Sequence, residues 1–164
     1  NDIHQLQRDK LEMICRKLRL KSGEKMLDIG FGWGSLALYA AANYGVHVTG
    51  VTLSERQLEF ATQKAEKLGL SDRVNFVLLD YAKVEGEFDK ISSIGMHEAI
   101  GIDNYPTYYS TIQRVLKPGG IYLHHAITRP AKKDAKTFAR RTRSSRCSPN
   151  ISSPAANSII SATP

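Results

Sequence analysis

The segment "KMLDIGFGWGS", residues 25–35, decides the fold of this 164-residue chain. Its first part, residues 25–29, is a short and largely apolar run typical of a buried strand. Gly30, Gly32 and Gly34 follow directly, and a helical pattern begins after them. In a parallel α/β sheet such a loop lies at the carboxyl edge of the strands, where missing side chains let a ligand approach the backbone. The segment therefore predicts a strand, a ligand-binding turn and a helix.

The chain up to residue 128 continues to alternate between strand and helix patterns. Further strands are expected at residues 46–53, 73–80, 88–95 and 121–128. Helices are expected at residues 3–20, 35–44, 54–68 and 105–116. This alternation predicts an α/β fold, a Rossmann-like doubly wound parallel sheet with right-handed crossovers and helices on both faces.

The charge of the chain divides it into two parts. Residues 1–128 carry 15 Lys and Arg against 15 Asp and Glu, whereas residues 129–146 carry eight basic residues against Asp134 alone. The formal net charge of +7 therefore belongs to the segment 129–164, which is basic and then rich in Ser and Pro. That composition predicts disorder and, taken alone, an arm that binds polyanions.

Other compositional features exclude several classes of protein. No apolar run approaches the ~18 residues of a membrane span, and no signal peptide or lipidation motif is visible. Cys15 lies in a helical pattern and Cys147 in the basic tail, so the two cysteines predict neither a disulfide framework nor a metal site. The cysteine usage fits a reducing compartment, so we expect a cytoplasmic protein.

Three motifs together resemble the core of S-adenosylmethionine (SAM) methyltransferases. They are "LDIGFGWG" at 27–34, "VTGVTLS" at 48–54 and "LLDY" at 78–81. One departure is plain, because the second strand ends in Thr52 where most such enzymes place a carboxylate for the ribose hydroxyls.

Longer motifs narrow the resemblance to one family. "FDKISSIGMHEAIG", "NYPTYYSTIQRVLKPGG" and "LHHAIT" follow in order after the glycine loop. Together they resemble the cyclopropane-fatty-acyl-phospholipid synthases, a family that includes the mycolic acid methyltransferases, from about Leu6 to Thr128. In that family threonine at the end of the second strand is normal, so Thr52 fits the pattern.

The resemblance implies the reaction, the partners and the catalytic residues. The methyl group of SAM is delivered to a cis double bond of a phospholipid acyl chain at a membrane surface, and a bound bicarbonate removes a proton as the ring closes. Such an acceptor implies a protein peripheral to the inner face of the membrane, and nucleic acid is not an expected partner. By this resemblance Glu98 and His125 hold the ion, and the backbone of Ile127 contacts it.

The resemblance also implies the cofactor site. It assigns the loop glycines to the methionine portion of SAM, Thr52, Leu53 and Gln57 to its ribose, and Tyr81 to its adenine. Asp28 and Asp80 are also expected to bind the cofactor. The predicted SAM-binding residues are Asp28, Gly30, Gly32, Gly34, Thr52, Leu53, Gln57, Asp80 and Tyr81.

Several of these residues also have ordinary structural explanations. Gln57 completes a capping box at a helix start, and Leu53 is explained by core packing. Asp80 ends a strand as a turn former, and Tyr81 is typical of a half-buried core aromatic. Tight strand-to-helix turns need glycine in any case, and His125 in isolation is typical of a hydrogen-bonded strand histidine.

The local sequence departs from the family pattern at four positions. His97 stands before the acid where an aromatic is usual, Ala99 stands after it, Phe31 replaces a common cysteine, and His124 replaces an apolar residue. The histidines and Glu98 suggest a metal cluster, but they lack a recognised ligand spacing, so we predict no metal site. These departures put activity in doubt more than they suggest a new activity.

Family members carry further segments before and after the part matched here, including a cysteine and a tyrosine of the ion site, a lid and two last strands. We therefore expect an incomplete fragment with an open sheet edge and little or no turnover. Read one base earlier from Asn150, the tail is compatible with "KYIFPGGELDHLGHT", which is similar to a family segment. This suggests a frame slip between Phe138 and Arg146.

Two other functions fit the same sequence. One is a related methyltransferase that acts on another lipid or on a small molecule. The other is a non-catalytic SAM-binding module whose basic tail contacts polyanions.

Overall fold

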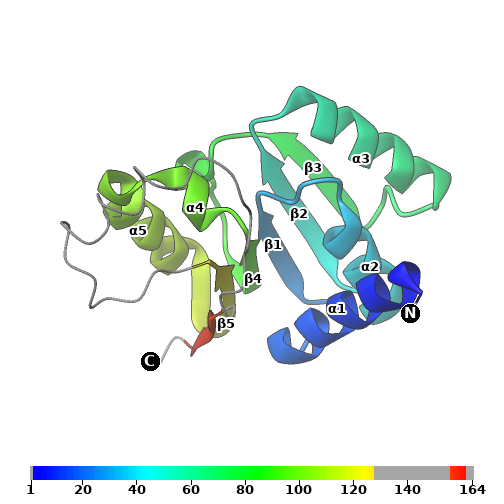
Figure 1. The fold of residues 1–164 in the computed structure, drawn as a ribbon, viewed down its shortest axis with the longest axis horizontal. Helices are drawn as coiled ribbons and strands as arrows, with labels where there is room; N and C mark the ends of the chain where they lie inside the picture. Colours follow the sequence, from blue (N-terminus) through cyan, green and yellow to red (C-terminus); the bar gives the residue numbers. More distant parts are fainter. Residues whose placement is uncertain (1, 128–155, 162–164) are drawn as a thin grey trace, which may run out of the picture.

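A computed structural model describes residues 2–127 and 156–161 of the chain (Figure 1). Its centre is a six-stranded sheet in the order β3-β2-β1-β4-β5-β6. The strands are β1 (Lys25–Ile29), β2 (His47–Thr52), β3 (Val74–Leu78), β4 (Phe88–Ile94), β5 (Leu116–Ala126) and β6 (Ala156–Ser161). The α-helices are α1 (Ile3–Leu18), α2 (Ser35–Tyr44), α3 (Glu55–Lys67), α4 (His97–Ile100) and α5 (Tyr105–Val115). Two 3-10 turns span Tyr81–Lys83 and Ile102–Asn104.

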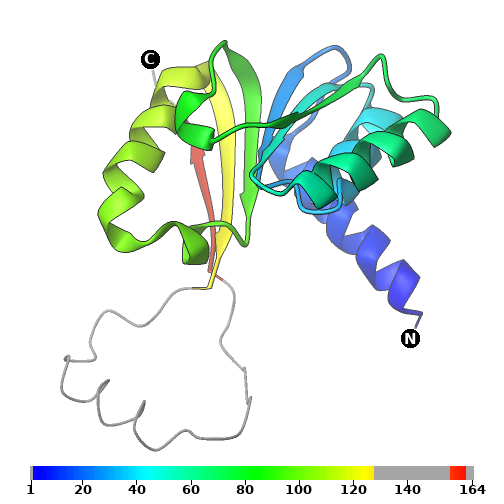
Figure 2. The same cartoon turned by 90° about the horizontal axis from the view of Figure 1, so that it is seen from above.

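The first five strands are parallel, and helices cover both faces of the sheet (Figure 2). The strand order reverses at β1, since β2 and β4 lie on its two sides. The predicted Rossmann-like doubly wound sheet is thus confirmed. In such a sheet the crevice beside this reversal, at the carboxyl ends of the strands, is the expected ligand site.

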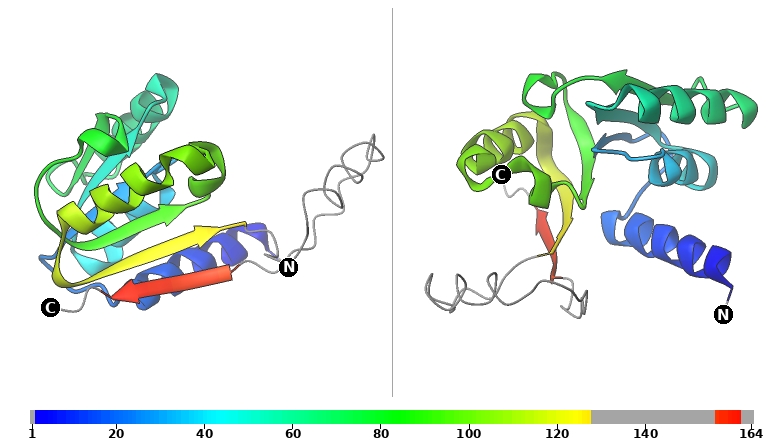
Figure 3. Two further views of the ribbon diagram at one scale, coloured as in Figure 1. Left: turned by 90° about the vertical axis from the view of Figure 1, so that its left-hand side faces the viewer. Right: turned by 45° about the horizontal axis from the view of Figure 1, so that its top comes forward.

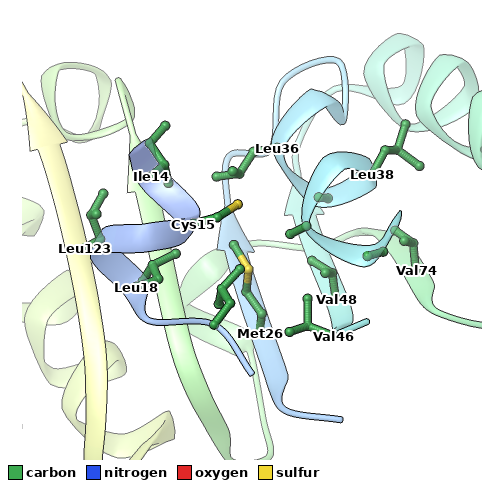
Figure 4. Packing of buried hydrophobic residues seen from close by; sticks show 14 of the residues in the cluster. Ile14, Cys15, Leu18, Met26, Leu36, Leu38, Val46, Val48, Val74 and Leu123 are labelled. Atoms are coloured by element: carbon green, nitrogen blue, oxygen red, sulfur yellow. The ribbon is translucent and has the colours of Figure 1, made fainter. Parts of the chain in front are cut away.

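Two apolar cores lie on opposite faces of the sheet. On one face, Cys15 and Leu18 of α1 pack toward Met26 and Leu123, together with side chains of α2 (Figure 4). On the other face, Tyr108 of α5 and its apolar neighbours pack on the strands. Because strand side chains alternate between faces, β1, β2, β4 and β5 contribute to both cores.

The helix starts follow the capping residues in the sequence. Asp2 accepts a hydrogen bond from the backbone N–H of His4 at 3.0 Å, and Ser54 accepts one from the N–H of Gln57 at 3.4 Å. Both contacts satisfy backbone donors that the first turn of a helix leaves unpaired. The expected helices at 3–20, 35–44, 54–68 and 105–116 all form, within a few residues at their ends.

Three features differ from the sequence-based expectations. The fifth strand begins at Leu116 rather than at residue 121, with a register shift opposite Phe88–Lys90. The short helix α4 was not expected. Residues 156–161, inside the segment expected to be disordered, form β6 and pair antiparallel with β5 (Figure 3). This pairing covers the edge of β5, which was expected to be open. The unpaired backbone groups of an edge strand can pair with an extended segment within reach.

The rest of the tail, including the region of the suggested frame slip and Cys147, lies outside the described residues. Within the described part of the chain, no helix combines the length and the apolar character that a membrane span requires.

Candidate functional site

The glycine loop joins β1 to α2 at the carboxyl edge of the sheet. Gly30 N–H donates to the carbonyl of Val51 at 2.9 Å, which ties the start of the loop to β2. A Cβ on Gly30 would meet Met96 Sδ at 2.6 Å, and one on Gly34 would meet Ala61 at 3.0 Å. A Cβ on Gly32 would meet nothing within 4 Å, although its φ of +59° disfavours any other residue. Gly32 is therefore the loop glycine that presents bare backbone to open space.

The larger cavity at this edge has a volume of about 530 Å³ and is lined by the loop and the ends of the neighbouring strands. Many of the residues that the sequence assigns to SAM line it, namely Gly30, Gly32, Thr52, Leu53, Gln57 and Tyr81. Met96 and Ala99, on or next to α4, also line it and were missed by sequence reasoning. A four-residue helix has too few residues for a periodic signal.

The hydroxyl of Thr52 is engaged within the protein. It donates to Oε1 of Gln57 at 2.9 Å and accepts from the N–H of Ser54 at 3.2 Å. Its donor is therefore used to orient the Gln57 amide, and the Gln57 side chain bonds to Thr52 instead of closing the expected capping box. The pair places an amide NH₂ at the cavity wall, where it can donate to a ligand hydroxyl.

The remaining predicted residues of this cavity differ in their placement. Leu53 is 69% exposed at the rim, so core packing does not explain it. Asp80 accepts from the N–H of Ala82 at 2.9 Å, as a turn former does, and is absent from the cavity lining. Tyr81 lines the cavity and packs edge-on against Tyr108, with ring centroids 5.3 Å apart.

A smaller cavity of about 230 Å³ lies on the α1 side of the same loop and shares Gly30, Gly32 and Ile94 with the larger one. Asp28 lines it, together with Lys10 of α1 and other helix residues. Sequence reasoning missed the α1 residues because the docking of that helix is a long-range contact. An elongated ligand lying across Gly32 can reach both cavities.

Asp28 is a buried carboxylate, only 3% exposed. Burial raises its pKa to about 6, and the hydrogen bond from Ser92 Oγ at 2.7 Å opposes that effect. A carboxylate next to a cavity at this depth can be stabilised by a cationic group of a ligand.

Glu98 on α4 meets the end of β5. Its Oε1 accepts a hydrogen bond from the backbone N–H of Ile127 at 2.7 Å. Partial burial raises the pKa of Glu98. Hydrogen bonds from the backbone N–H groups of Ile127 and of Glu98 itself lower it, as do the nearby His97 and His124. Together they outweigh burial, so the pKa of Glu98 lies below its ordinary value. Glu98 is consequently an ionised carboxylate near neutral pH, and the structure brings it to the predicted partner Ile127.

His125 is not brought to Glu98 by any described hydrogen bond. It pairs in register with Ile94, which packs on the α1 core, and it follows Leu123 of that core by two residues. Strand alternation therefore places His125 on the α1 face, opposite to His124. The backbone N–H of Ile127 already donates to the Glu98 carboxylate. Glu98, His125 and the Ile127 amide, in this arrangement, therefore do not form a site that would attract an anion such as bicarbonate.

The unusual His97 and His124 lie together. Their rings meet edge to face with centroids 4.7 Å apart, on the α5 face of the sheet. Burial lowers the pKa of His124, and His97 lowers it further. Among the described residues, no group of three or more His, Cys, Asp and Glu side chains is arranged to hold a metal ion.

Phe31, the departure within the glycine loop, has a packing role. Its ring lies 4.4 Å from that of Phe76, centroid to centroid. A Cβ on Gly50 would come within 2.8 Å of both rings, so the aromatic pair closes over a bare strand position.

The residues at the carboxyl edge of the sheet fit the chemical groups of SAM. The bare backbone of Gly32 borders both cavities, the Thr52–Gln57 pair offers donors for hydroxyls, and the carboxylate of Asp28 suits an amino group. Tyr81 and Leu53 provide apolar surface for an aromatic base.

Comparisons with known proteins identify the family. The family model described as mycolic acid cyclopropane synthetase matches residues 1–154. The chain is 46% identical over 127 residues, 77% of its length, to the cyclopropane-fatty-acyl-phospholipid synthase of Escherichia coli K12, and covers 32% of that protein. It is 40% identical over 149 residues to a probable fatty acid methyltransferase of Pseudomonas putida, covering 86% of this chain and 38% of the relative. The chain thus spans about a third of the length of these curated relatives.

Solved structures agree with the sequence relatives. The cyclopropane synthase MmaA2 of Mycobacterium tuberculosis has a TM-score of 0.78 and 27% identity, covering 87% of this chain and 53% of that one. The mycolic acid cyclopropane synthase CmaA1, solved with SAH and CTAB, has a TM-score of 0.77 and 27% identity, with 87% and 52% covered. The chain therefore belongs to the mycolic acid cyclopropane synthetase family, whose members include cyclopropane fatty acid synthases and fatty acid methyltransferases that depend on SAM.

Proposed function

We propose that this chain forms the SAM-binding core of an enzyme that adds a methylene or methyl group to the cis double bond of unsaturated phospholipid acyl chains. The observation that carries the proposal is the cavity at the carboxyl edge, where Gly32, the Thr52–Gln57 pair and Tyr81 converge. The family relationship supports the acceptor class, since relatives are named for fatty acyl phospholipids and fatty acids.

In this proposal each part of the site has a defined task. SAM, when bound, supplies an electrophilic methyl group. Gly32 lets the ligand lie against the backbone, Gln57 donates to the ribose hydroxyls in the orientation that Thr52 imposes, and Asp28 receives the amino group. The protein's contribution is thus to fix the position of the reactants and to place charges and dipoles around them, which are large terms in group transfer.

Glu98 is proposed to serve proton handling next to this cavity. Its lowered pKa keeps the carboxylate ionised, and Ile127 N–H fixes one of its oxygens. Bicarbonate, which the family resemblance implies as the proton acceptor, needs Ile127 N–H to be released from Glu98 before it can bind there. No step is assigned to the ion or to His125 in the present arrangement.

The acceptor is proposed to be reached at a membrane surface from the cytoplasmic side. The test uses the whole protein with labelled SAM and vesicles of phosphatidylethanolamine that carries cis-monounsaturated chains. Mass spectrometry of the acyl chains should show a gain of one methylene unit, and vesicles of fully saturated lipid should show none. Label transfer that is equal for both vesicles, or absent from lipid while SAM binds, would contradict the acceptor class.

A further inference from the structure

The short helix α4 cannot hold its own position. It has four residues, none of them buried, and no side chain caps its N-terminus at Met96. One helical turn fixes several backbone dihedrals for very few hydrogen bonds, so contacts with the rest of the fold must hold it. At its C-terminal end Asn104 Nδ2 donates to the carbonyl of Ile100 at 2.9 Å. Met96 and Ile100 pack against the apolar core on the α5 face. Near the start of the helix, the side chain of His97 adds a further attachment.

His97 sits among aromatic rings from α5 and β5. It stacks on Tyr105 with centroids 3.9 Å apart and planes 23° apart, and its Nε2 lies 3.2 Å from the hydroxyl of Tyr109. The edge-to-face contact with His124 and a longer one with Tyr108 complete what we call the His97 box, formed by Tyr105, Tyr108, Tyr109 and His124. A ring held on several sides cannot turn without breaking several contacts at once.

The walls of the His97 box are themselves braced. The hydroxyls of Tyr108 and Tyr122 lie 2.9 Å apart, and the Tyr122 hydroxyl lies 2.9 Å from Nδ1 of His124. All three side chains are buried. This hydrogen-bonded chain links α5 to β5 and fixes two walls of the His97 box, Tyr108 and His124, relative to each other.

The next residue after His97 is Glu98, whose carboxylate meets Ile127 N–H at the end of the same strand that carries His124. We propose that His97 is a positioning residue: by locking α4 into the His97 box it holds the Glu98 carboxylate on the amide of Ile127. The consequence for catalysis rests on the proposed function, whereas the positioning itself is a property of this chain. The proposal also gives a role to two residues that depart from the family pattern, His97 and His124, whose rings contact each other in the His97 box.

The test is the titration of Glu98 in the chain, labelled with ¹³C at the glutamate carboxyls, with Glu98→Gln used to assign its signal. In the parent chain Glu98 should titrate below an ordinary glutamate because Ile127 N–H favours the charged form. His97→Ala should raise the Glu98 pKa toward the ordinary value and move the Ile127 amide resonance. His97→Phe keeps the stacked ring and should retain most of the lowered pKa.

The matched control is His47→Ala, which removes an exposed histidine at the amino end of β2, away from α4. It should leave the titration of Glu98 unchanged. If His97→Ala fails to fold, Tyr105→Leu removes the stacking partner and should give the same rise. An unchanged Glu98 titration in the folded His97→Ala or Tyr105→Leu chain overturns the proposal. Failure of the chain to bind SAM would count against the proposed function alone, because this titration needs no SAM.

Discussion

Ser92 Oγ on β4 donates a 2.7 Å hydrogen bond to Asp28 Oδ1 on β1, and both side chains are buried next to the glycine loop. Sequence reasoning placed Asp28 at the cofactor site by its position before the glycines. The structure adds that the carboxylate lies at a depth where its charge is unfavourable. A group retained at such a cost suggests a task that a neutral side chain does not perform.

The stability of the fold should therefore depend on pH through Asp28. Its folded-state pKa of about 6 exceeds the ordinary value of 3.8, so the folded chain holds this proton more tightly than the unfolded chain. The free energy of unfolding should fall as pH rises between these values, by at most about 3 kcal/mol from this group. Asp28→Asn should be more stable than the parent at pH 7 and not at pH 4, as measured by urea unfolding.

Asp72→Asn, a substitution at an exposed position, is the control for that measurement. Its stability should depend on pH as that of the parent does. Parallel unfolding curves for the parent and Asp28→Asn across the whole range would contradict a buried, raised-pKa carboxylate. On the proposed function, Asp28→Asn should also bind SAM more weakly at pH 7.

Thr52→Val tests the role assigned to the Thr52–Gln57 hydrogen bond. Valine keeps the shape of the side chain but cannot donate to Gln57 or accept from Ser54, so the Gln57 amide loses its orientation. We expect SAM affinity to fall about fivefold, corresponding to roughly 1 kcal/mol for one hydrogen bond. Isothermal titration calorimetry measures it, with Thr49→Val on the same strand as the control. Equal affinities for the two variants would show that Gln57 needs no such orientation.

The docking of α1 can be tested by a matched pair of leucines on that helix. Leu18 is fully buried against the sheet, whereas Leu6 is 57% exposed. Leu18→Ala should lower the free energy of unfolding by about 2–5 kcal/mol through lost contacts and a cavity, and Leu6→Ala by less than about 0.5 kcal/mol. Denaturant titration followed by circular dichroism distinguishes them, and similar losses for both would mean that α1 packs through another face.

Much of the fold follows from local patterns. The loop glycines, the apolar run before them and the capping residue Ser54 are read from neighbouring residues, and the structure agrees at each. β6 could not be predicted in this way, because its pairing with β5 joins segments that are about thirty residues apart and half of its residues are Asn or Ser, which favour turns and loops. The early start of β5 is also a pairing effect, set by β4.

The site was predicted less completely than the fold, for physical reasons. The family resemblance implies that Thr52 lies at the ribose, but only the structure shows that its hydroxyl donates to Gln57. The residues of α4 and α1 that line the cavities are placed by tertiary contacts that leave no periodic signal. His97 and His124 depart from the family pattern without a recognised ligand spacing, and the edge-to-face contact of their rings between α4 and β5 is visible only in three dimensions.

The central claim, that the bare backbone of Gly32 seats SAM, is tested most directly by SAM-induced thermal stabilisation of the chain. Saturating SAM should stabilise the parent by about 2.7 kcal/mol at one hundred times Kd. Gly32→Asp should lose this effect. Gly69→Asp, with a nearly equal φ of +66° and equally open surroundings far from the cavities, should keep it. Stabilisation of the Gly32→Asp chain equal to that of the parent, or no stabilisation of the folded parent, would contradict the account.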